Sequence, residues 1–142
     1  MGLSQEVKQF LKKFGWSDER KIDIKKQKTF LENEGYEVFE SAQRFLSSFA
    51  DIRFEIPLDH DKVHFDPIKA ASNIFIENIK FYEERTGEKM IPVGENSYHY
   101  TLLLSISGKM YAGFDDFLFL LGDDYESAIE TLYYDLDKIA IP

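Results

Sequence analysis

Two histidines, His60 and His64, have the spacing that most resembles a metal-binding motif. In the zinc motif of metalloproteases, two histidines four positions apart share one face of a helix, and a Glu between them acts as general base. Here the surrounding apolar residues alternate, which is typical of a strand, and the intervening carboxylate is the shorter Asp61. We therefore interpret the pair as part of a turn and a strand face, not as a metal site.

Asp59, Asp61 and Asp66 are of the residue type that binds calcium in an EF-hand loop, but their spacing does not match that loop. With Asp59 as the first position, His64 occupies the place of the turn Gly and Ala70 the place of the bidentate Glu. The sequence also lacks Cys, a glycine-rich phosphate loop and a Ser in a nucleophile elbow. We expect no catalytic residue, no metal and no cofactor. A small hydrolase with an unmarked pair of carboxylates is the least favoured alternative.

Acidic residues outnumber basic ones, and they are unevenly distributed. The formal net charge is −9, from 26 acidic and 17 basic side chains. Residues 1–30 hold 8 basic and 4 acidic side chains, whereas residues 115–142 hold 8 acidic and 1 basic. An acidic chain repels phosphate backbones and attracts a basic protein. We expect a protein partner, no direct nucleic-acid binding and no small-molecule substrate.

Length and composition predict one domain over residues 1–142, since 44% of the residues are hydrophobic and 15% aromatic. The absence of Cys fits a reducing compartment. The first residues are polar, and the longest apolar run, residues 117–121, is far shorter than the roughly 20 residues that span a bilayer. We expect a cytoplasmic protein with no membrane association.

Hydrophobic periodicity predicts helices in the first third of the chain and strands after it. Helical spacing and capping residues favour helices at residues 4–15, 23–34, 38–49, 66–87 and 123–139. The helix from 66 to 87 is expected to be continuous and the last helix to bury Leu136 and Ile139. Alternation favours strands at residues 52–58, 63–65, 98–106, 109–114 and 117–121, with a short strand and turn at 91–94.

Pro57 places the first of these strands near a sheet edge. Strands and helices do not alternate regularly along the chain. The predicted fold class is therefore α+β, with a mainly antiparallel central sheet flanked by helices.

Several landmarks, read in order, resemble one protein family. They are Gly15-Trp16 with Arg20, Gly35 followed by Ala42 and Phe45-Leu46, Phe65-Asp66-Pro67, Ile91-Pro92-Val93-Gly94-Glu95, Gly108-Lys109-Met110-Tyr111, and Leu120-Leu121-Gly122-Asp123. This pattern is similar to the third subfamily of the SUKH superfamily, the immunity proteins of bacterial polymorphic toxin systems. The resemblance implies a SUKH-like α+β fold and a protein that binds and neutralises a cognate toxin, with nucleases among the toxin classes. A cytoplasmic scaffold or regulatory module of the same fold is the alternative.

If the partner is a basic toxin, the acidic C-terminal third is the natural place to contact it. The candidate toxin contacts are Asp115, Asp116, Asp123, Asp124, Glu126 and Tyr111. Tyr111 and Tyr134 are included among interface candidates because both fall off the main apolar stripes. For Asp123 and Asp124 the competing interpretation is a helix cap. For Trp16 and Arg20 we favour packing on the core over contact with a partner.

Overall fold

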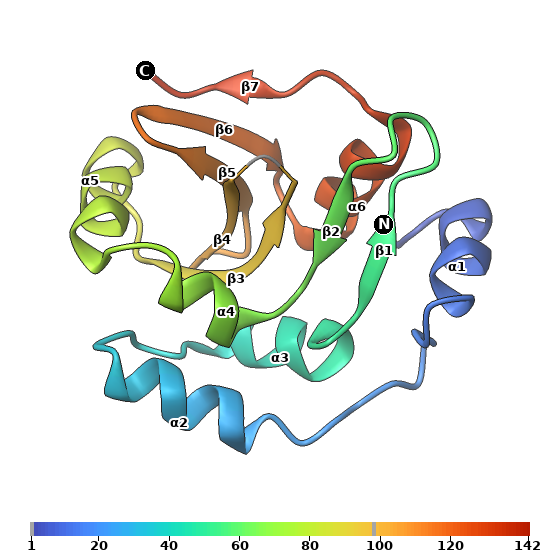
Figure 1. Ribbon diagram of the computed structural model, residues 1–142, viewed down its shortest axis with the longest axis horizontal. Coiled ribbons are helices and arrows are strands. Elements are labelled where there is room, and N and C mark those ends of the chain that lie inside the picture. The colour runs from blue at the N-terminus through green and yellow to red at the C-terminus, as the bar shows by residue number, and fades with distance from the viewer. Residues whose placement is uncertain (1, 98) are drawn as a thin grey trace.

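The computed structural model describes residues 2–97 and 99–142 (Figure 1). Residue 98, where one strand was predicted to begin, lies outside the described residues. The helices in this part of the chain are α1 (Gln5–Lys12), α2 (Lys25–Asn33), α3 (Glu40–Phe49), α4 (Pro67–Ser72), α5 (Ile76–Thr86) and α6 (Tyr125–Tyr134). The strands are β1 (Arg53–Glu55), β2 (Lys62–His64), β3 (Met90–Asn96), β4 (Tyr100–Ser105), β5 (Met110–Phe114), β6 (Phe117–Gly122) and β7 (Ile139–Ala140). This confirms the α+β class.

The strands form one antiparallel sheet in the order β1-β2-β3-β4-β5-β6-β7, so each strand pairs with its neighbours in sequence. Strand β1 lies at the edge of the sheet, and Pro57 comes two residues after its last residue, Glu55. This confirms the predicted edge position, because Pro has no N–H to donate to a second neighbouring strand. In such an order, successive connections lie at alternating ends of the sheet. The β1–β2, β3–β4 and β5–β6 connections therefore share one end, which we name the hairpin end.

Capping residues explain where three of the helices begin. Ser4 accepts a hydrogen bond from the Val7 N–H at the start of α1. Asp66 accepts from the Lys69 N–H and precedes a Pro at the first helical position of α4. Asp124 forms a capping box with Ser127 at the start of α6. Each side chain satisfies a backbone donor that the helix itself leaves unpaired.

Helices cover both faces of the sheet, and two glycines in the strands show how closely α5 and α6 pack against it. A Cβ on Gly113 of β5 would lie 2.6 Å from the Tyr82 ring of α5. A Cβ on Gly122 of β6 would lie 2.5 Å from the Ala128 backbone nitrogen of α6. Gly122 pairs with Met110, which points to the opposite face from Gly113. Thus α5 and α6 pack on opposite faces, and Figure 1 shows them on either side of β4, β5 and β6.

The expected continuous helix from 66 to 87 is wrong, because the chain breaks it between α4 and α5. The Asn73 N–H closes α4 onto Lys69 and Ala70, and its side-chain amide donates to Glu95 Oε2 at 2.9 Å. Phe75 then adopts an extended conformation before α5 and its side chain is 75% exposed. Asn is a weak helix former whose side chain bonds outside the helix here, which explains the break.

The predicted last helix also ends early. Asp135 has a left-handed backbone, with φ of 53°, and closes α6. The chain then crosses to β6, where Ile139 and Ala140 form β7 and Ile141 N–H donates to the Leu118 carbonyl at 2.8 Å. Leu136 and Ile139, which were expected to be buried, are both exposed. The helical spacing of these residues therefore did not reflect a helix.

The segment predicted as a short strand and turn at 91–94 is instead the middle of β3. Pro92 is tolerated there because the register shifts between Pro92 and Gly94. A Cβ on Gly94 would lie 2.5 Å from the His64 carbonyl oxygen, so only Gly allows β2 to pass this closely. Beyond this bulge, Glu95 and Asn96 at the end of β3 pair with His64 and Val63 of β2.

Candidate functional site

The acidic residues predicted from the sequence lie in two separate places. Asp115 and Asp116 form the tight turn between β5 and β6 at the hairpin end, and both are exposed. Their carbonyl oxygens accept hydrogen bonds from Tyr82 Oη and Arg85 Nη1, each at 2.7 Å. The turn backbone is therefore held by α5, and its two carboxylates face solvent.

Asp123, Asp124 and Glu126 lie beyond the other end of β6, about 17–20 Å away along a six-residue strand. Asp124 Oδ1 accepts from the Ser127 N–H at 2.7 Å, so its carboxylate caps α6. Glu126 is half-buried, and burial, with a smaller contribution from Asp124, raises its pKa. These three residues do not form one surface with Asp115 and Asp116.

Tyr111 is a poor contact candidate, because its side chain is only 4% exposed. The prediction that it lies off the apolar faces is wrong: β5 is a central strand covered on both faces, and its first four positions are all buried. Burial also raises the pKa of its hydroxyl. Tyr134 is partly exposed, and its hydroxyl donates to Glu6 Oε1 at 2.9 Å, which joins α6 to α1.

Trp16 and Arg20 hold the loop after α1 against α3. The Trp16 ring is buried, stacks on Phe49 at 5.5 Å between centroids, and donates its N–H to Ser48 Oγ. Arg20 donates to the backbone carbonyls of Ser48 and Ala50, each at 2.6 Å. Both side chains are used within the fold, as expected.

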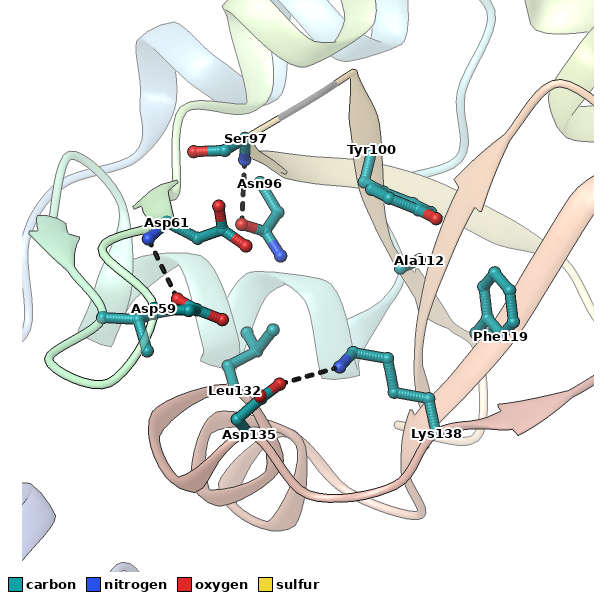
Figure 2. A pocket seen from close by; sticks show the side chains of 11 residues that line it. Asp59, Asp61, Asn96, Ser97, Tyr100, Ala112, Phe119, Leu132, Asp135 and Lys138 are labelled. Atoms are coloured by element: carbon teal, nitrogen blue, oxygen red, sulfur yellow. Dashed lines mark hydrogen bonds and ion pairs between the residues drawn. The ribbon is translucent and has the colours of Figure 1, made fainter.

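A hollow of about 190 Å³ opens at the hairpin end (Figure 2). Its walls come from the β1–β2 loop, the strands β3 to β6 and the end of α6. The lining residues are Ile56, Asp59, Asp61, Asn96, Ser97, Tyr100, Ala112, Phe119, Leu132, Asp135 and Lys138. Figure 2 shows the carboxylates of Asp59 and Asp61 on one side of the hollow and the rings of Tyr100 and Phe119 on the other.

Backbone geometry holds the first two carboxylates in place. The Asp61 N–H donates to Asp59 Oδ1 at 2.9 Å, and the Ile56 N–H donates to the Asp61 carbonyl at 2.6 Å. His60 between them has φ of 63°, a left-handed conformation that reverses the chain. The Lys62 N–H donates to Ser97 Oγ at 2.6 Å, which fixes this loop to the end of β3.

The third carboxylate, that of Asp135, comes from the left-handed end of α6. It pairs with Lys138 at 3.6 Å. Burial, followed by the charges of Asp59 and Asp135, raises the pKa of Asp61, while Lys138 acts in the opposite direction. The hollow thus holds three carboxylates and one ammonium group. The carboxylates outnumber the ammonium group, so the formal charge of the lining residues is negative.

Aromatic rings continue from Tyr100 and Phe119, which form one wall of the hollow, along the hairpin end of the sheet. Tyr100 contacts Phe119 and Phe114, at 6.2 and 5.7 Å between ring centroids. Phe117 stacks on Phe119 at 6.5 Å, and His99 stacks on Phe114 at 6.1 Å. We call these five residues the aromatic row. Phe114 and Phe117 flank the Asp115-Asp116 turn, so this pair of predicted acids borders the row.

The histidines of the described residues do not build a metal centre. In residues 2–97 and 99–142, no group of three or more His, Cys, Asp or Glu side chains is placed to hold a metal ion. His60 lies in the β1–β2 loop beside Glu55, and His64 lies on β2, where burial and then Arg53 lower its pKa. None of the described helices has the length and apolar composition needed to cross a bilayer.

A family model described as SUKH-3 immunity protein matches residues 3–135. The chain belongs to the SUKH-3 immunity protein family. The resemblance identified from the landmarks is therefore confirmed, and an immunity role with a toxin as partner follows from the family. Neither a search of curated proteins nor a search of solved structures found a match to this SUKH-3 protein.

The sequence did not point to the hollow. Asp59 and Asp61 do not fit a calcium loop, Asp61 does not complete a paired-histidine zinc motif, and Asp135 is one of eight acids in residues 115–142. Tyr100 falls within the strand predicted at residues 98–106, and Lys138 is the one basic residue in residues 115–142. The available signal was the run Asp59-His60-Asp61, in which two acids flank a single turn residue.

Proposed function

We propose that this SUKH-3 protein is a single immunity domain, residues 1–142, that neutralises a cognate toxin in the cytoplasm by binding it. The family match carries the proposal. The protein acts as a stoichiometric inhibitor and not as an enzyme. The surface at the hairpin end supports binding, because it combines the exposed Phe117 and the partly exposed Tyr100 and Phe119, a side-chain type that interfaces favour, with carboxylates.

The proposed partner is a basic toxin domain, and a nuclease is the toxin class that this charge suits best. A nuclease carries basic residues where it holds phosphate, so an acidic inhibitor can cover that surface and associate quickly. The net charge of −9 supports such steering. Asp115 and Asp116 remain proposed contacts because they border the aromatic row. Asp123 and Glu126 would touch a second part of the toxin.

Co-expression tests the proposal. The toxin domain encoded beside this protein is expressed in a sensitive host, alone and together with the protein. We expect the protein to restore growth and the two proteins to purify as a complex. Growth that stays arrested, with no complex recovered, contradicts the immunity role for that pair.

A further inference from the structure

We infer that the hollow at the hairpin end is where the toxin docks, and that it receives a Lys or Arg side chain from a basic segment of the toxin. This inference rests on the proposed function and adds to it the contact surface and the chemistry of the partner. The aromatic row and the exposed apolar residues around the hollow form the rest of the contact.

Charge argues for a cationic occupant. Asp135 already pairs with Lys138 at 3.6 Å, whereas the hydrogen bond that Asp59 Oδ1 accepts comes from the backbone N–H of Asp61. Asp61 is partly buried near Asp59 and Asp135, and burial together with their charges raises its pKa, an effect that Lys138 offsets only in part. A Lys or Arg side chain entering the hollow would relieve this repulsion.

The opposite wall suits the same occupant. The rings of Tyr100 and Phe119 face the acids across the hollow (Figure 2). An ammonium or guanidinium group within about 6 Å of an aromatic ring centroid is attracted to its face. The fold already contains such a pair, since the Arg85 guanidinium lies 5.4 Å from the Phe81 centroid. The aliphatic stem of Lys or Arg would pack on the same rings.

Size and surroundings favour a protein partner over a small molecule. The volume of about 190 Å³ is below the roughly 300–1,000 Å³ of small-molecule pockets. Three exposed apolar residues adjoin lining residues: Leu58 precedes Asp59, Ile139 follows Lys138, and Phe117 stacks on Phe119. Their side chains are 69%, 61% and 58% exposed. In protein interfaces, a side chain of one partner often fills a central pocket of the other, and further contacts surround that pocket. The hollow and the exposed apolar residues around it have this arrangement.

The test measures binding of the purified neighbouring toxin domain to variants that change charge with little change in shape. Asp59→Asn with Asp61→Asn keeps the side-chain oxygen that accepts the Asp61 N–H and removes two charges. We expect Kd to rise about tenfold or more. Lys138→Gln makes the hollow more negative, and we expect association to become faster. Opposite effects of the two changes are specific to a cationic occupant.

The matched control is Glu32→Gln with Glu84→Gln, which removes the same charge from exposed positions on α2 and α5. We expect a much smaller change in Kd, and a circular dichroism spectrum like that of the unmodified protein for all variants. If the unmodified protein binds and the Asp59/Asp61 variant binds equally well, this inference is overturned while the immunity role stands. If the unmodified protein itself does not bind, the proposed function and this inference both fall.

Discussion

Variants of Asp124 can show whether its carboxylate stabilises the fold as a helix cap or contacts a partner. Its Oδ1 accepts from the Ser127 N–H at 2.7 Å, and the Ser127 side chain accepts in return from the Asp124 N–H. Replacing an N-cap Asp with Ala costs about 0.5–2 kcal/mol, typically about 1. We expect Asp124→Ala to lower the free energy of unfolding by about 1 kcal/mol, which is roughly 3–5 °C in Tm for a chain of this length.

Two companion variants show which property matters. Asp124→Asn keeps an oxygen that caps the helix equally well and loses only the charge near the helix N-terminus, so we expect a loss of a few tenths of a kcal/mol. Asp123→Ala changes the neighbouring exposed acid and is expected to stay within about 0.5 kcal/mol of the unmodified protein.

Urea unfolding, followed by circular dichroism, measures all three variants. The midpoint should fall for Asp124→Ala while the slope with denaturant stays constant. Equal stability of Asp124→Ala and Asp123→Ala would refute the assignment of Asp124 as a cap. A large loss of toxin affinity for Asp124→Asn would show that its charge acts in binding as well.

Three further predictions concern stability. Burial, with nearby glutamates, raises the pKa of Tyr36 to about 12. Between pH about 10 and 12 the native state therefore keeps this proton while the unfolded state loses it, so the free energy of unfolding should fall by about 2–3 kcal/mol across that range. Alkaline titration of Tyr36→Phe should show a smaller fall. Gly113→Ala should cost about 1–3 kcal/mol in urea unfolding, because the new Cβ would lie 2.6 Å from the Tyr82 ring; an unchanged midpoint contradicts this packing. Folding raises the pKa of Asp61, so its negative charge lowers stability at pH values above its unfolded-state pKa of about 3.9. Asp61→Asn should therefore stabilise the protein at pH 7 and not at pH 3. Equal effects at both pH values would refute the pKa shift.

Local sequence patterns predicted much of the fold. Asp66 and Asp124 lie at helix starts because a carboxylate there satisfies unpaired backbone donors, and this effect is local. Pro57 correctly indicated that the strand beside it, β1, lies at the sheet edge. The break at Asn73 was missed because its side chain bonds to Glu95, a residue 22 positions away whose proximity depends on the sheet.

The candidate site was less predictable than the fold. Asp59, Tyr100 and Asp135 are far apart in the chain and meet only because the sheet order brings the β1–β2 loop and the end of α6 to the same hollow. Conversely, Asp115 and Asp123 are close in sequence, but β6 separates them. Charge density along the chain therefore pointed to acidic residues without showing which of them share a surface.

The most direct test of the central claim titrates the purified neighbouring toxin domain with this protein and measures the remaining toxin activity. Inhibition by binding predicts that activity falls linearly and ends near one molecule of this protein per toxin molecule. Complete inactivation at a small fraction of that ratio would indicate a catalytic mechanism, and full activity in the presence of excess protein would contradict neutralisation by binding.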